Sequence, residues 1–332
     1  MEKQCNECKN PILEVKDLRV KFSVHKKWLP AVDGVNLCIQ PGEIIGVVGE
    51  SGSGKSVMSQ SILRLRDHAT AVQYEGALLL KRPLSKMREI RGNDISVIFQ
   101  DPLNSLSPVH TVGKQLSEIV LLHKNVTKSE AKARSIEMLK LTGIPNPEDC
   151  MKKYPFELSG GMQQRVMIAM ALACEPKLLI ADEPTTALDV TIQEQILHLI
   201  KELNEKLGMS VLFITHDMGA VAQLCHSVKV MYLGQVVEDT TTEELFANPL
   251  HPYTEGLLAC IPHLGVERGK ELPTIPGTVP PLTKIPVGCH FCTRCKYADD
   301  RCKNTQPPLV EARKGHLVKC WKYADQAVKE EV

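Results

Sequence analysis

The sequence lacks any apolar run long enough to cross a membrane. Of its 332 residues, 43% are hydrophobic, but the longest runs, such as residues 166–174, fall well short of the roughly 18 to 20 apolar residues that a spanning helix needs. The opening segment, MEKQCNECKN, has no apolar core of a signal peptide. We therefore expect any membrane role to come through partner chains.

Net charge is also nearly absent. The formal charge is +1, which removes any general electrostatic argument for nucleic-acid binding, so we expect no nucleic-acid partner. Cysteine, in contrast, is abundant at 12 residues, of which five crowd between Cys289 and Cys320. Without an export signal, free thiols or a metal site are favoured over disulfides.

The hydrophobic pattern divides the chain into four segments. Residues 1 to about 100 are rich in predicted strands, residues 101–157 are predicted to be helical, residues 158–247 alternate between strand and helix, and a proline- and cysteine-rich tail follows from residue 248. Such alternation indicates an α/β fold with a mostly parallel sheet. Predicted strands cover residues 12–22, 42–48, 178–181 and 211–215, and predicted helices cover 57–65, 112–122, 129–141 and 192–207.

A phosphate-binding loop follows the strand predicted at residues 42–48. The segment GESGSGKS fits the pattern G-x-x-x-x-G-K-[ST] and is followed by a predicted helix. Glycines let the backbone wrap around phosphates, and the helix N-terminus adds partial positive charge there. We expect Lys55 to neutralise the β- and γ-phosphates of ATP and the Ser56 hydroxyl to bind Mg²⁺. The expected loop consists of Gly49, Glu50, Ser51, Gly52, Ser53, Gly54, Lys55 and Ser56.

Four further motifs follow in the chain. They are FQDP at residues 99–102, LSGGMQQR at 158–165, LLIADEP with a nearby ALD at 178–189, and THD at 215–217. The apolar strand that ends in Asp182 places a carboxylate beside Mg²⁺, and Glu183 is positioned to polarise the attacking water. The pair could otherwise be two solvated acids at a strand end, but the buried run before them disfavours that alternative.

Together these motifs resemble those of ABC transporter ATPases over residues 12–247. The resemblance implies a P-loop NTPase fold, with a RecA-like core, an antiparallel β subdomain and a helical subdomain at about 101–157. It further implies that Gln100 links the Mg²⁺ and water site to the membrane partner, that His216 senses the γ-phosphate, and that Phe22 stacks on adenine, although Trp28 lies nearby. In this family, the signature segment contacts ATP held by an opposing subunit in a head-to-tail dimer. The residues assigned to that contact are Ser159, Gly160, Gly161, Gln163 and Asp189.

The tail points to one branch of the family. ADEPTTALDV at 181–190, HPYT at 251–254 and TIPG at 274–277 are similar to the D-type ATPase subunit of oligopeptide and dipeptide importers. That resemblance extends over nearly the whole chain, with residues 248–332 as a loop-rich extension. Importers of nickel and glutathione share the branch, so the same ATPase could serve another small solute.

The cysteines of the tail have a spacing that matches a metal site. Thiolates suit iron–sulfur or zinc, and uncoordinated thiols are the third alternative. The resemblance implies a [4Fe–4S] cluster on Cys289, Cys295, Cys302 and Cys320, although Cys292 departs from the usual pattern and leaves one ligand open. Cys5 and Cys8 are interpreted as exposed thiols.

The resemblance also implies an assembly at the cytoplasmic side of the cell membrane. Its expected members are a second, F-type ATPase subunit, two membrane-spanning permease subunits and, indirectly, an external peptide-binding protein. A soluble ABC ATPase of translation or DNA repair is the alternative from another class. The compact segment between Lys55 and Ser159, without long insertions, argues against it.

Overall fold

The computed structural model describes residues 10–24, 26–65, 73–74, 77–78, 83–100, 105–186, 189–261 and 273–327. They form two compact units, one from the described parts of residues 1–13, 38–44 and 77–214, and the other from those of residues 14–37, 45–76 and 215–332. Cys5 and Cys8 lie outside the described residues.

Three parallel strands form the sheet of the first unit. They pair in register, so that Ala181 lies opposite Ile98 on one side and Phe213 on the other. The middle strand is buried at every position, as expected for a parallel strand covered on both faces. The strands are β6 (Ile95–Ile98), β7 (Leu178–Asp182) and β8 (Ser210–Thr215), and the short β5 (Ala77–Leu78) also belongs to this part of the chain.

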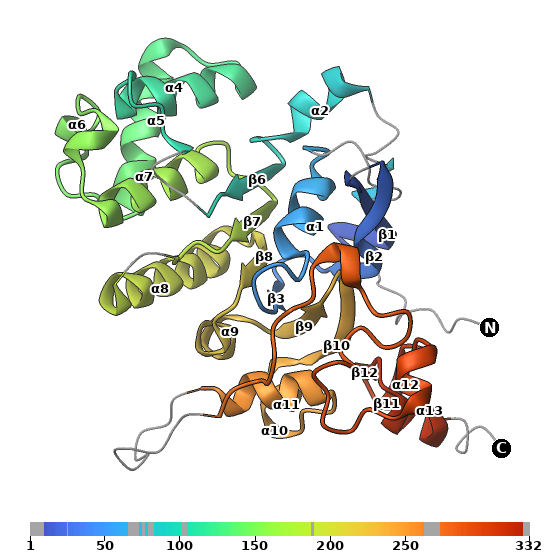
Figure 1. The fold of residues 1–332 in the computed structure, drawn as a ribbon. Helices are drawn as coiled ribbons and strands as arrows, with labels where there is room; N and C mark the ends of the chain where they lie inside the picture. Colours follow the sequence, from blue (N-terminus) through green and yellow to red (C-terminus); the bar gives the residue numbers. More distant parts are fainter. Residues whose placement is uncertain are drawn as a thin grey trace. The chain divides into compact units, whose positions relative to one another are not determined.

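Helices make up the rest of the first unit (Figure 1). The two helices predicted at 112–122 and 129–141 are present, but the second begins earlier than expected. Thr127 caps it in a reciprocal capping box with Glu130, so Ser129 lies inside the first turn. The helices are α2 (Leu84–Ile90), α4 (Val112–His123), α5 (Lys128–Leu141), α6 (Pro147–Cys150), α7 (Gly160–Leu172) and α8 (Val190–Leu207), with a 3₁₀ turn at Pro155–Glu157.

The second unit contains both parallel and antiparallel pairing. Strand β3 (Ile44–Val48) runs parallel to β9 (Ser227–Tyr232), whereas β10 (Gln235–Thr241) pairs antiparallel with β9. A smaller group has the order β2 (Lys27–Ile39), β1 (Leu13–Val24) and β4 (Gln73–Tyr74). The helices are α1 (Lys55–Ile62), α9 (Met218–Leu224), α10 (Thr242–Ala247), α11 (Pro252–Ala259), α12 (Asp300–Asn304) and α13 (Trp321–Ala327), with a 3₁₀ turn at Leu282–Lys284.

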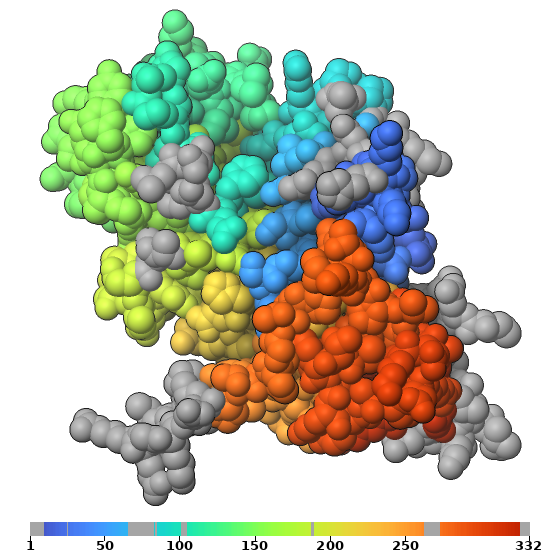
Figure 2. Space-filling view, in the orientation of Figure 1, coloured from blue at the N-terminus to red at the C-terminus, as the bar shows by residue number. Residues whose placement is uncertain are grey.

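The C-terminal extension is built into the sheet of the second unit. Strand β12 (His316–Val318) pairs antiparallel with β10, and β11 (Val310–Arg313) continues the sheet beyond it. Figure 2 shows the described residues of the extension, coloured orange to red, side by side on one face. The tail therefore has more regular structure than its proline content suggests, because its strands take their hydrogen bonds from an existing edge.

A buried acid fixes this edge. Glu238 on β10 is fully buried, and its carboxylate accepts hydrogen bonds from the main-chain N–H groups of Leu250 (2.7 Å) and His251 (2.9 Å). Its Oε1 also lies 2.7 Å from Nε2 of His316, which is equally buried. Burial alone would raise the pKa of Glu238, but these hydrogen bonds outweigh burial and leave the pKa lowered. Both oxygens of the charged carboxylate thus have partners inside the protein.

Among the described residues, none of the helices combines the length and apolar character required to span a bilayer.

We predict that His316→Ala lowers the free energy of unfolding by about 3 kcal/mol, since it leaves Glu238 buried without its side-chain partner. Urea unfolding followed by circular dichroism measures the change. Lys152→Ala is the matched control, because its ion pair with Asp149 is exposed and should contribute less than about 1 kcal/mol. Equal effects of the two substitutions would contradict the role of Glu238 and His316.

Candidate nucleotide site

The phosphate-binding loop follows directly from β3. All five residues of this strand are buried, and its register with β9 brings Val48 opposite Val230. Only glycine fits at two points of the loop. A Cβ atom on Gly49 would lie 2.2 Å from the carbonyl oxygen of Met231, and one on Gly54 would lie 2.6 Å from that of Ala31. The spacing of glycines in the motif is therefore set by close backbone packing.

Lys55 lies inside this loop. Its side chain is 4% exposed, and Nζ donates to the carbonyl oxygens of Gly49 (2.7 Å) and Glu50 (3.1 Å) and contacts Oγ of Ser53 at 3.5 Å. The loop wraps around the ammonium group and holds it in place. A buried cation surrounded by main-chain groups suits an anionic ligand.

Helix α1 begins at Lys55, directly after Gly54. Gly54 has a φ of 101° and provides no side-chain cap, so the N–H groups of the first turn do not donate to a capping side chain. Such a helix start attracts anions through its N–H groups and its dipole. The loop and the helix together provide the elements of a phosphate site, with Ser56 in the first turn.

Two other predicted residues belong to the second unit. His216 is exposed immediately after β8, and the next residue, Asp217, caps α9 by accepting from the N–H groups of Gly219 (2.8 Å) and Ala220 (3.3 Å). Phe22 on β1 is half-buried, whereas Trp28 on β2 is 56% exposed. Both aromatic residues remain candidates for stacking on a base.

The predicted catalytic acid lies in the first unit, at the end of β7. Glu183 Oε2 accepts hydrogen bonds from Nε2 of Gln100 (3.0 Å) and from Oγ1 of Thr186 (3.0 Å). Gln100 follows β6 and is exposed, while Asp182 is only 3% exposed. Parallel pairing of β6 and β7 brings these residues to the same edge, since the strand ends lie side by side.

The backbone at Glu183 is also unusual. Its φ is 49°, in the left-handed region that residues other than glycine avoid, and its N–H donates to the carbonyl of Ile214 at 2.8 Å. Gln164 on α7 donates to the carbonyl of the next residue, Pro184 (2.5 Å). Strained backbone held by such bonds is typical of functional sites and costs about 1 to 3 kcal/mol.

The glycine-rich motif at residues 158–165 forms the start of α7. Ser159 is the N-cap and is exposed, as is Gly160, around which a Cβ atom would meet nothing within 4 Å. A Cβ on Gly161 would instead lie 3.2 Å from Ile192 of α8. This close packing brings the starts of α7 and α8 together and leaves Ser159 and Gly160 open to a ligand or partner.

Two residues of the predicted set have structural tasks here. The side chain of Gln163 is 4% exposed and donates to the carbonyls of Pro155 (2.9 Å) and Leu158 (3.2 Å), so it braces the turn before α7 and does not join the exposed surface of Ser159 and Gly160. Asp189 is exposed and caps α8 by accepting from Ile192 N–H at 3.0 Å. Residues 187 and 188 of the same motif lie outside the described residues.

The structure adds residues that motif reading missed. Tyr253 and Arg294, both from the C-terminal part of the chain, contact Glu50 in the phosphate-binding loop. Tyr253 belongs to the HPYT segment, which was part of the resemblance to peptide importers but had no predicted role at the nucleotide site. Arg294 lies between Cys292 and Cys295 and carries no sequence signal of its own.

The five cysteines of the extension share one neighbourhood. The N–H of Cys289 donates to the carbonyl of Cys302 at 2.8 Å, and that of Cys292 to the carbonyl of Cys289 at 3.0 Å. Burial raises the pKa of Cys289 to about 12 and of Cys320 to about 11, and neighbouring thiols add to both shifts. Within the described ranges, no group of three or more His, Cys, Asp or Glu side chains is arranged to hold a metal ion.

Comparison with known proteins agrees with this geometry. A family model described as ABC transporter matches residues 32–186, and one described as the oligopeptide/dipeptide transporter C-terminal region matches residues 237–302. The oligopeptide transport ATP-binding protein AppD of Bacillus subtilis is 48% identical over 96% of this chain and 99% of the relative. The oligopeptide transport ATP-binding protein OppD of the same organism is 49% identical over 93% of this chain and 88% of the relative.

Solved structures give the same result. The dimeric post-hydrolysis state of the ATP-binding cassette MJ0796, bound to ADP and Pi, matches with a TM-score of 0.64 and 29% identity over 69% of this chain and 98% of that one. The cbiO1 protein of Clostridium perfringens, part of the ABC transporter complex cbiONQ, matches with a TM-score of 0.62 and 30% identity over 72% and 92%. The chain thus belongs to the ABC transporter ATPases and has their P-loop fold. Within that family, its relatives AppD and OppD are ATP-binding proteins of oligopeptide transport.

We predict that Glu183→Gln lowers the rate of ATP hydrolysis by about 100- to 10,000-fold while MgATP still binds, because an amide cannot accept the proton of the attacking water. Phosphate release by the assembled ATPase measures the rate. Glu175→Gln is the control, since that acid is exposed and paired with Arg134. A Glu183→Gln rate within threefold of wild type would refute the assignment.

Proposed function

We propose that this ABC ATPase powers the import of peptides, either oligopeptides or dipeptides. The observation that carries the proposal is that a single chain holds an ATP-site loop and an extension that matches the oligopeptide/dipeptide transporter C-terminal region. Relatives that align over nearly their full length have names from oligopeptide transport. The chain would supply the energy for transport and leave cargo recognition to its partners.

The residues of each unit have their own chemical task in this proposal. In the second unit, Lys55 and the start of α1 would bind the β- and γ-phosphates, and Ser56 would be a ligand of Mg²⁺. In the first unit, Asp182 and Gln100 would be ligands of Mg²⁺. Glu183 polarises the attacking water, and its hydrogen bonds from Gln100 and Thr186 hold the acid in position for that step. His216, which is exposed at a strand end, contacts the γ-phosphate.

The working unit is a dimer of ATPase subunits. Ser159 and Gly160 are exposed beside the start of α8, where Asp189 is also exposed, so this surface is available to ATP held by an opposing subunit. We propose an F-type chain as the partner in a head-to-tail heterodimer. ATP binding closes the dimer, and hydrolysis with phosphate release opens it again.

The membrane partners dock on the helical segment. Apolar side chains of this segment are exposed, including Val109 (73%), Leu122 (74%) and Phe156 (71%). We propose that this segment receives the coupling helix of the membrane partner. The assembly then has two membrane-spanning permease subunits, with this chain peripheral to the membrane on its cytoplasmic side and an external peptide-binding protein delivering cargo.

Transport assays test the cargo. In cells that lack this gene, uptake of a radiolabelled peptide should be at background, and the wild-type chain should restore it while Glu183→Gln should not, because transport requires hydrolysis. Uptake of ⁶³Ni²⁺, measured in parallel, should not change. Nickel uptake that follows the gene, with unchanged peptide uptake, would favour the small-solute alternative.

We further propose that the cysteines of the extension bind a [4Fe–4S] cluster through Cys289, Cys295, Cys302 and Cys320. The donor set supports this, since thiolates are the ligands that such clusters take. These thiols influence one another electrostatically, and the main-chain N–H of Tyr297 donates to Sγ of Cys295 at 3.4 Å. The raised pKa values describe neutral thiols, which would lose their protons on metal binding. A bound cluster would brace the extension.

Anaerobic purification followed by iron, sulfide and zinc analysis tests the cluster. We expect about four irons per chain, lost in Cys302→Ser and retained in Cys174→Ser, a buried thiol outside the group. Retention in Cys292→Ser would identify Cys292 as the thiol that is not a ligand. Stoichiometric zinc, or neither metal, would reject the iron–sulfur assignment.

A further inference from the structure

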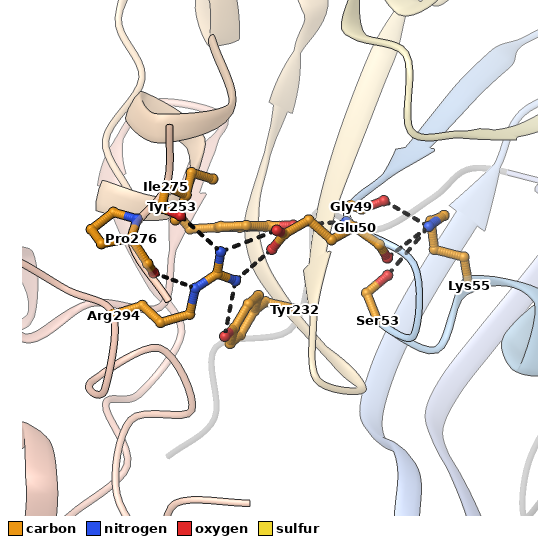
Figure 3. Close-up of polar contacts among 9 residues, drawn as sticks. All are labelled: Gly49, Glu50, Ser53, Lys55, Tyr232, Tyr253, Ile275, Pro276 and Arg294. Carbon is orange, nitrogen blue, oxygen red and sulfur yellow. Dashed lines mark hydrogen bonds and ion pairs between the residues drawn. The ribbon is translucent and has the colours of Figure 1, made fainter. Parts of the chain in front are cut away.

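Arg294 joins the C-terminal extension to the phosphate-binding loop. Its side chain is 3% exposed, and the guanidinium donates twice to the carboxylate of Glu50, at 2.6 and 3.1 Å (Figure 3). Nε of the group donates to the main-chain carbonyl of Pro276 (2.9 Å), and Nη2, which also donates to Glu50, contacts that of Ile275 (3.4 Å). A bidentate ion pair, together with hydrogen bonds to main-chain carbonyls, restricts both the position and the orientation of the guanidinium group.

Glu50 is held at three points. Besides the carboxylate, its main-chain N–H donates to the hydroxyl of Tyr253 at 2.8 Å, and its carbonyl accepts from Nζ of Lys55 at 3.1 Å. The residue that anchors the phosphate-binding lysine is therefore itself anchored by residues of the C-terminal part. Movement of Arg294 or Tyr253 would shift the carbonyl that supports Lys55.

A buried aromatic cluster supports these contacts. Tyr232, Tyr253 and Phe291 are almost completely buried, with ring centroids 4.7 to 5.4 Å apart. The guanidinium of Arg294 lies 5.9 Å from the ring centre of Tyr232 and 6.0 Å from that of Phe291. The rings close one side of the ion pair to water, which strengthens its charge interaction.

Charge provides the functional reason for this arrangement. Glu50 places a carboxylate in the loop that binds the negatively charged phosphates of ATP. An unpaired acid there would repel the nucleotide, whereas an acid paired with Arg294 is neutralised locally. The loop can then use Glu50 as a structural anchor without losing affinity for phosphate.

We propose that Arg294 is a positioning residue for ATP binding, which neutralises Glu50 and fixes the loop carbonyls that hold Lys55. The proposal rests on the ATP-binding role assigned above. It makes the folded extension a condition for an ordered nucleotide site, in addition to any role in the assembly.

Equilibrium binding of a fluorescent ATP analogue to the full-length chain tests the proposal, with KM and kcat measured on the assembled ATPase. Arg294→Ala should weaken binding by about 10- to 100-fold and raise KM more than it lowers kcat, since it leaves Glu50 unpaired. Arg294→Lys should restore part of the affinity. Arg313→Ala, another arginine of the extension, should bind like wild type.

Removing the acid separates charge from simple loss of structure. Glu50→Gln should tighten binding by about 2- to 5-fold, because a negative charge near the phosphates disappears. The double substitution of Glu50→Gln with Arg294→Ala should recover the part of the affinity that Arg294→Ala loses through charge, while the part lost through movement of the loop should remain lost. Weaker binding in Glu50→Gln, or no recovery in the double variant, would overturn the electrostatic role even where Arg294→Ala folds poorly.

Binding by the wild-type chain distinguishes a failure of ATP binding from a failure of the role proposed for Arg294. Failure of the wild-type protein to bind the analogue would reject ATP binding itself. Normal wild-type binding together with an unchanged Arg294→Ala variant would reject only the role of Arg294.

Discussion

The buried ammonium group of Lys55 is the constraint on which the nucleotide site depends. A cation that is almost completely removed from water is costly unless polar groups surround it, and here main-chain carbonyls of the loop do so. That arrangement requires a tight backbone, which in turn requires glycine at positions 49 and 54, where any side chain would collide with neighbouring carbonyls. The strands β3 and β9 fix the backbone from which the loop departs.

The same constraint gives the C-terminal extension a role at the nucleotide site. Its strand β12 is bound to β10, and its residue Arg294 reaches Glu50, whose carbonyl supports Lys55. The ion pair and the loop form a continuous set of contacts from Arg294 through Glu50 to Lys55 (Figure 3), within the same unit as the pairing of β12 with β10. In this chain, part of the proposed support for ATP binding thus lies outside the residues of the phosphate-binding motif.

Local sequence patterns predicted many of the strands and helices. The strands at residues 178–181 and 211–215 and the helices at 112–122 and 192–207 were found within a few residues of their expected limits, because period and length suffice for regular elements. The contact of Arg294 with Glu50 was not predictable, since it joins residues far apart in the sequence and neither forms part of a periodic pattern. Strand β12 as an added strand likewise depends on a partner, β10, that a local pattern does not contain. The cap at Thr127, in contrast, follows from the local pattern of Thr127 and Glu130.

Equilibrium binding of MgATP to the purified full-length chain and to Lys55→Ala measures how much the buried cation contributes to the nucleotide site. We expect the wild-type chain to bind MgATP and Lys55→Ala to bind it about 100-fold more weakly, because the phosphates lose their buried cation. A Lys55→Ala variant that is folded by circular dichroism and binds MgATP as tightly as wild type would contradict this expectation.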